Sequence, residues 1–62
     1  MQTQATTTGG RAELVDELRR AAVGWDHFGK TPLSAEARAG ADEIEAGATS
    51  VRVGHVEYLV TE

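Results

Sequence analysis

Residues 51–60 have the sequence VRVGHVEYLV, in which the apolar positions change parity halfway. Before Gly54 they are odd-numbered, and from Val56 onward they are even-numbered. A strand alternates its two faces with every residue, so one continuous strand cannot keep both sets on the same side. A two-residue turn at Gly54 and His55 resolves the conflict, and the segment is therefore predicted to form a β-hairpin.

The predicted turn fixes the register of the hairpin. Each residue then faces a partner of matching character: Val53 with Val56, Arg52 with Glu57, and Val51 with Tyr58. One face becomes apolar, and the other carries a cross-strand ion pair. Glycine at the first turn position favours a type II′ turn, because that position needs a positive φ.

Upstream, the segment from Arg11 has the apolar spacing of a helix. Its stripe follows positions i, i+1, i+4, i+7, i+8 and i+11: Leu14, Val15, Leu18, Ala21, Ala22 and Trp25. Two ends are compatible with the sequence. The helix ends at Gly24, or it continues to Phe28 with Gly29 as its stop, and the position of Trp25 on the stripe favours the second.

A second helix is predicted over residues 35–46. Pro32 biases the residue before it away from helix, Ser34 is a good N-cap, and Gly47 is a good stop. The inner face consists mainly of small side chains with one large one, Ile44, so this helix is expected to approach its neighbours closely.

These elements indicate an α+β fold in which two helices pack on a C-terminal antiparallel hairpin. Residues 1–10 are rich in Thr and Gln and end in two glycines, so they are expected to form a flexible, disordered arm. Residues 11–62 are then one small domain. Much of the 40% hydrophobic content is alanine, so the core is thin. A two-stranded hairpin is marginal alone, and we expect self-association as a homodimer or in a larger assembly.

The composition argues against several partner classes. The net charge is −4 and there is no cysteine, so electrostatics give no help toward nucleic acid or anionic membranes, and thiolate metal sites are absent. No run approaches the roughly 20 apolar residues of a membrane span. We expect a cytoplasmic protein without a membrane partner.

Catalytic chemistry has little support in the sequence. His27 and His55 are assigned to different elements, and Ser34 is assigned to a helix cap. No nucleophile, base and orienting group come together, and no metal-ligand spacing is present. The sequence predicts no catalytic, metal or cofactor-binding residues and no small-molecule substrate, and we expect a protein that is not an enzyme.

Candidate partner-binding residues fall into two groups. Trp25 and Phe28 are three apart, which puts them on one side of a helix, with Leu33 shortly after them. Burial in the core is the competing explanation for both aromatics, and exposure of either one beside Leu33 would favour an interface. The second group comprises the carboxylates of the second helix, which form a solvated face or an acidic docking surface: Glu36, Asp42, Glu43 and Glu45.

The sequence therefore predicts a small non-enzymatic protein-binding or regulatory module, with another protein or a second copy of itself as partner. The order of two helices and a hairpin also resembles a minimal winged helix in outline, which makes a DNA-binding regulator the first alternative. Four carboxylates against Arg38 alone on the second helix argue against it, because phosphates attract cations. A structural accessory subunit of a larger assembly is the other alternative.

Overall fold

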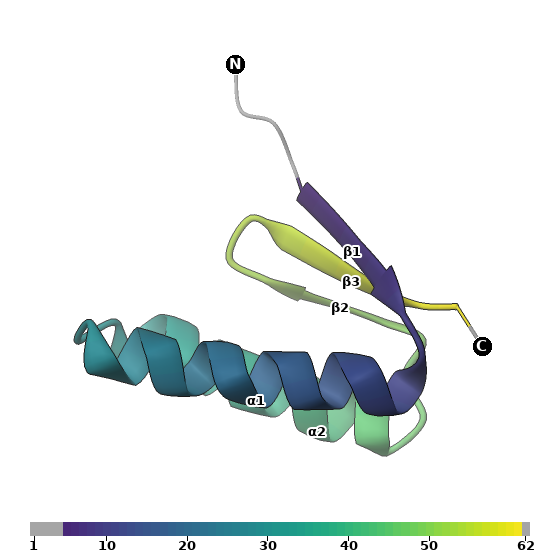
Figure 1. Cartoon of the computed structure of the whole chain (residues 1–62), viewed down its shortest axis with the longest axis horizontal. Coiled ribbons are helices and arrows are strands. Elements are labelled where there is room, and N and C mark those ends of the chain that lie inside the picture. The colour runs from purple at the N-terminus through teal and green to yellow at the C-terminus, as the bar shows by residue number, and fades with distance from the viewer. Residues whose placement is uncertain (1–4, 62) are drawn as a thin grey trace.

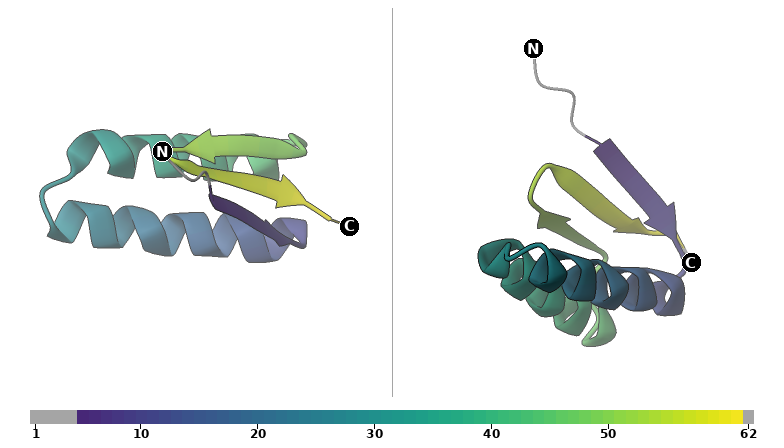
Figure 2. Two further views of the ribbon diagram at one scale, coloured as in Figure 1. Left: turned by 90° about the horizontal axis from the view of Figure 1, so that it is seen from above. Right: turned by 60° about the vertical axis from the view of Figure 1, so that its left-hand side comes forward.

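The computed structural model describes residues 5–61. Two antiparallel helices lie side by side against one face of a three-stranded sheet, which confirms the α+β class and the packing of both helices on the hairpin (Figures 1 and 2). The elements are β1 (Ala5–Gly9), α1 (Arg11–His27), α2 (Thr31–Glu45), β2 (Ser50–Val53) and β3 (Val56–Val60). Within these residues, neither helix is long and apolar enough to cross a membrane.

The hairpin of β2 and β3 has the predicted register. Val53 pairs with Val56, and Val51 pairs with Tyr58. Gly54 has a φ of 61°, and no non-glycine residue among those described has a positive φ. His55 therefore has a negative φ, which confirms the type II′ pattern.

The sheet has a third strand that the sequence prediction missed. Residues 5–9 form β1, which pairs in parallel with β3, so the expectation of a flexible arm is wrong for this segment. Residues 1–4 lie outside the described part of the chain. Threonines suit a strand even without large apolar neighbours, and the ladder is closed by hydrogen bonds that Ala5 N donates to His55 O (3.2 Å) and Thr61 N donates to Gly9 O (2.9 Å).

Both helices end in the same glycine motif. In α1, Gly29 has a φ of 74°, its N–H donates to Asp26 O (3.0 Å), and the N–H of Lys30 donates to Trp25 O (2.8 Å). This pattern is a Schellman motif. The helix thus extends past Gly24, as the second alternative predicted, and Phe28 is its C-cap. Gly47, with a φ of 123°, ends α2 in the same way.

The second helix begins earlier than predicted. It starts at Thr31 instead of residue 35, with Pro32 in its first turn, where no backbone N–H is needed. Ser34 is therefore not the N-cap. It is fully buried inside the helix, and its hydroxyl accepts a hydrogen bond from Arg38.

The core lies between the helix pair and the inner face of the sheet. Its members are Leu14, Val15, Leu18, Ala22, Ala37, Ala41, Ile44, Val51, Val53 and Tyr58. Small residues let α2 approach the sheet closely: a Cβ on Gly40 would lie 3.2 Å from Val51 Cγ2. The guanidinium of Arg11 closes the far end of the pair by donating to the carbonyls of Ile44 (2.6 Å) and Ala48 (2.8 Å).

Candidate functional site

The sheet does not cover the whole length of the helix pair. The end where α1 connects to α2 projects beyond the hairpin turn (Figure 1 and the left view of Figure 2). This projecting end carries the C-terminal turns of α1 and its Schellman motif. Phe28 is the C-cap of α1, its N–H still donates to Gly24 O (3.2 Å), and its side chain is 74% exposed.

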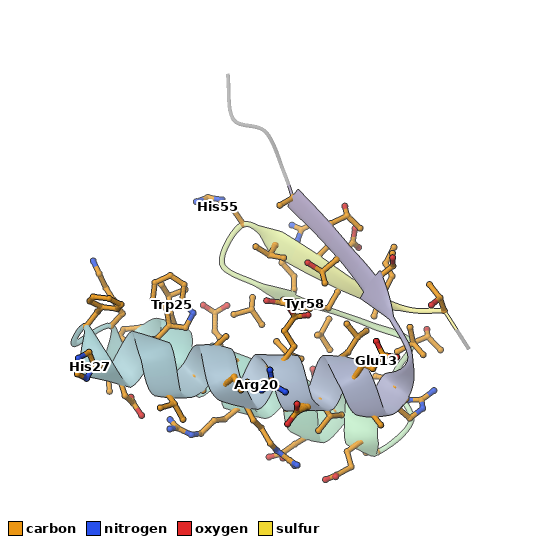
Figure 3. All side chains as sticks on the ribbon, in the orientation of Figure 1. Glu13, Arg20, Trp25, His27, His55 and Tyr58 are labelled. Carbon is orange, nitrogen blue, oxygen red and sulfur yellow. The ribbon has the colours of Figure 1, made fainter. Side chains whose placement is uncertain are left out.

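An apolar groove of about 260 Å³ lies between this end of α1 and strand β3. It is lined by Ala21, Gly24, Trp25, Phe28 and Tyr58. Figure 3 shows Trp25 rising from α1 on the sheet side, while Tyr58 extends from the sheet toward α1. We call the groove that these five residues line the aromatic groove.

The aromatic groove gathers every Trp, Tyr and Phe of the chain, because the sequence has one of each. Their exposure is graded. Tyr58 is 8% exposed and belongs to the core, Trp25 is half-buried, and Phe28 projects into solvent. The ring of His27 contacts Phe28 edge-on, with ring centroids 5.8 Å apart. Tyr58 therefore forms a buried wall of the groove, and Phe28 forms a rim that projects into solvent.

The hollow of the groove exists because residue 24 has no side chain. Gly24 is in the interior of α1, where glycine costs about 1 kcal/mol relative to alanine. A Cβ on Gly24 would meet no atom within 4 Å, whereas a Cβ on Gly40 would lie only 3.2 Å from Val51 Cγ2, a tight contact. Packing within the monomer thus explains the glycine of α2 but not that of α1.

The carboxylate of Glu17, one turn before Ala21 on α1, acts electrostatically on Tyr58. The pKa of Tyr58 is raised, chiefly because the phenol is buried and secondly because the negative charge of Glu17 disfavours the phenolate. Glu17, Ala21, Gly24 and Phe28 follow positions i, i+4, i+7 and i+11, one stripe of the helix. Among the residues that the structure describes, the phenol of Tyr58 has no hydrogen-bond partner.

A polar cluster fixes the projecting end of the helix pair. Arg38 of α2 donates hydrogen bonds to Asp26 of α1 (2.6 Å) and to Ser34. The guanidinium of Arg38 holds the pKa of Asp26 below its ordinary value, and the hydroxyl of Ser34 lowers it further. The cluster connects the last turn of α1 to the first turns of α2, next to the rim of the groove.

The structure does not bring the acidic candidates to this groove. Arg19 of α1 pairs with Asp42 (3.6 Å) and Glu45 (3.1 Å), so these carboxylates join the two helices. Glu36 and Glu43 are exposed on α2. The predicted acidic surface is therefore partly neutralised within the chain.

Of the three apolar candidates, two lie together. Trp25 and Phe28 line the aromatic groove, whereas Leu33 packs under the hairpin turn, its Cδ2 3.2 Å from where a Cβ on Gly54 would lie. Burial in the core, the competing explanation for both aromatics, is wrong for Phe28. The sequence prediction also missed Ala21, Gly24 and Tyr58 as lining residues. A glycine within an apolar helical stripe, beside two aromatics, was the available signal.

A larger hollow of about 470 Å³ lies at the opposite end of the helix pair. Its lining includes Arg11, Asp16, Arg19 and Glu45. The charges there are engaged within the chain, since Arg11 binds the backbone carbonyls of Ile44 and Ala48, Arg19 binds Glu45, and Asp16 binds Arg20.

The two histidines of the chain lie on different elements. His27 is on α1 and His55 is at the hairpin turn, well separated in Figure 3. Within residues 5–61, no three side chains of the His, Cys, Asp and Glu types are placed to hold a metal ion. No family model, curated protein or solved structure matches this chain.

Proposed function

We propose that this chain is a small non-enzymatic protein-binding module with a regulatory role in the cytoplasm, and that the aromatic groove is its binding surface. The single observation that carries the proposal is the convergence of all three aromatic residues of the chain on one groove, with Phe28 exposed at its rim. Aromatic side chains are enriched in interface hot spots because they bury much area at little entropic cost.

The distribution of charge supports a protein partner over nucleic acid. Within residues 5–61, four arginines are held by carboxylates, or by backbone carbonyls and a serine, of the same chain: Arg11, Arg19, Arg20 and Arg38. Contacts to phosphates need cations that are free to exchange their counterions. The groove itself is lined by apolar side chains, which suits an apolar anchor on another polypeptide.

The experiment is a selection of peptides from a random library on the immobilised protein, followed by mapping with NMR. We expect the selected peptides to shift the amide signals of Ala21, Gly24 and Tyr58, and to change the emission of Trp25, the only tryptophan. Phe28→Ser should weaken these peptides at least tenfold, about 1.4 kcal/mol.

Val23→Ser is the matched control. Val23 is 65% exposed and is one residue from Gly24, about 100° around the same helix. It should leave peptide affinity within twofold of wild type, on the order of 0.4 kcal/mol. Peptides that map to other surfaces, or that lose as much affinity with Val23→Ser as with Phe28→Ser, would contradict the proposed function.

A further inference from the structure

We infer that the occupant of the aromatic groove is α1 of a second copy of this chain, in an antiparallel, two-fold symmetric contact centred near Gly24. The inference rests on the proposed function, since it names the partner of the same groove. Three features of the described residues carry it: the shape of the groove, the charges at its two ends, and the glycine between them.

The shape of this region is self-complementary. Phe28 projects from the rim, and the hollow over Ala21 and Gly24 lies one to two turns earlier on the same face of the helix. A two-fold axis perpendicular to α1 near Gly24 places Phe28 of each copy against Ala21 of the other. Isologous interfaces have this property, because the same patch must be both knob and hole.

Gly24 and Ala21 lie where the two helices would cross. Helices pack with their axes about 8–10 Å apart, and the smallest side chains permit the shorter distances. A crossing at Gly24 gives a reason for a glycine that packing within one copy does not explain.

The charges at the two ends fit the antiparallel direction. Glu17 lies about two turns before Gly24, and Lys30 lies past the other end, with its N–H bound to Trp25 O. Neither side chain has an ion-pair partner in the part of the chain that the structure describes. In the antiparallel contact each Glu17 faces Lys30 of the other copy, so two pairs form at once, whereas a parallel contact would bring like charges together.

Glu13, one turn before Glu17, has no ion pair among the described residues, whereas the arginines and the other two carboxylates of α1 are occupied. Arg20 is paired with Asp16, and Asp26 with Arg38. A standard interface takes about 800 Å² from each partner, close to a fifth of the 4177 Å² surface of this chain. One helix face supplies less than that, so the dimer is expected to be weak, with a dissociation constant in about the micromolar range.

The test is sedimentation equilibrium of the full chain at low salt, from low micromolar to millimolar concentration. We expect a reversible monomer–dimer equilibrium. Glu17→Lys and Lys30→Glu should each raise the dissociation constant at least tenfold, because symmetry turns two attractive pairs into repulsive ones. The double variant should return to within threefold of wild type. Glu36→Lys, a charge reversal of the same size on exposed α2, should leave the constant unchanged.

Each outcome has one meaning. A chain that stays monomeric at millimolar concentration, while selected peptides still bind the groove, overturns the second copy as occupant and leaves the proposed function standing. A monomer whose groove binds no peptide overturns both. A dimer that is indifferent to the two single reversals, or that the double variant does not restore, uses another surface and also overturns the inference. Circular dichroism of every variant verifies that it is folded.

Discussion

Phe28 and Tyr58 line the same groove, Phe28 from the end of α1 and Tyr58 from β3, and the exposed fractions of their side chains differ greatly. Phe28, the C-cap of α1, is 74% exposed, and Tyr58 of β3 is 8% exposed within the core. One aromatic therefore contributes almost nothing to folding, while the other is shared between the core and the groove. This division allows binding and stability to be changed independently.

Truncation of these two residues should have very different effects on the free energy of unfolding. Phe28→Ala should change it by less than about 0.5 kcal/mol, as for other exposed positions. Tyr58→Ala should lower it by about 3–5 kcal/mol, the range for buried aromatic residues. Urea titrations followed by circular dichroism measure both. A large loss with Phe28→Ala would mean that its ring is part of the core.

Alanine substitution of Gly24 and of Gly40 should change the stability of the monomer differently, because only Gly40 packs closely against another element of the same chain. Gly24→Ala should stabilise the monomer by about 0.5–1 kcal/mol, because the helix gains propensity and the new methyl meets no neighbour. Gly40→Ala should not stabilise it, because its methyl would lie 3.2 Å from Val51 Cγ2. Thermal melts at low micromolar concentration provide the comparison. Equal gains at both sites would contradict the packing of α2 on the sheet.

The hairpin turn should be intolerant of a branched residue. Gly54 has a φ of 61°, which costs an ordinary L-residue about 1–2 kcal/mol, and its added Cβ would also lie 3.2 Å from Leu33 Cδ2. Gly54→Val should therefore lower stability by more than that range. Melting curves superimposable on wild type would show that the turn has another conformation.

The hairpin and both helices could be predicted from the sequence because each has a strong local signal. The parity change around Gly54 admits one register, and that register is observed. The helical stripe and Gly29 give the extent of α1 to within one residue. Strand β1 could not be predicted in this way. Its partner is at the other end of the chain, and its Thr-rich sequence gains stability from backbone pairing with β3 instead of from side-chain burial.

The candidate site was predictable in part. The spacing of Trp25 and Phe28 indicated a shared face, and the structure places both on one groove. Phe28 is exposed at the C-cap of α1, and spacing alone does not report how far the sheet covers the helix. Tyr58 joins the groove only through the packing of the sheet on α1, and no local pattern reports such a contact.

The ion pair between Asp26 and Arg38 should make the free energy of unfolding depend on pH in the acid range. The pKa of Asp26 is below its ordinary value of 3.8, so its carboxylate stabilises the fold above that pH, and the contribution is lost as the pH falls through the lowered pKa. Asp26→Asn should therefore be less stable than wild type at neutral pH, and the difference should narrow in acid. Urea unfolding across this range measures the difference, with Glu36→Gln as the control. A difference that is constant with pH would contradict the link.

The most direct test of the groove as a contact between copies is oxidative cross-linking, since the chain has no cysteine of its own. A two-fold axis near Gly24 brings the two copies of that residue within the Cα separation of about 4.4–6.8 Å that a disulfide requires. Gly24→Cys should form a disulfide-linked dimer rapidly under mild oxidation, and Val23→Cys, at a more exposed position on another face of α1, should do so only slowly. Equal rates for the two variants, or faster linkage through Val23→Cys, would contradict the account.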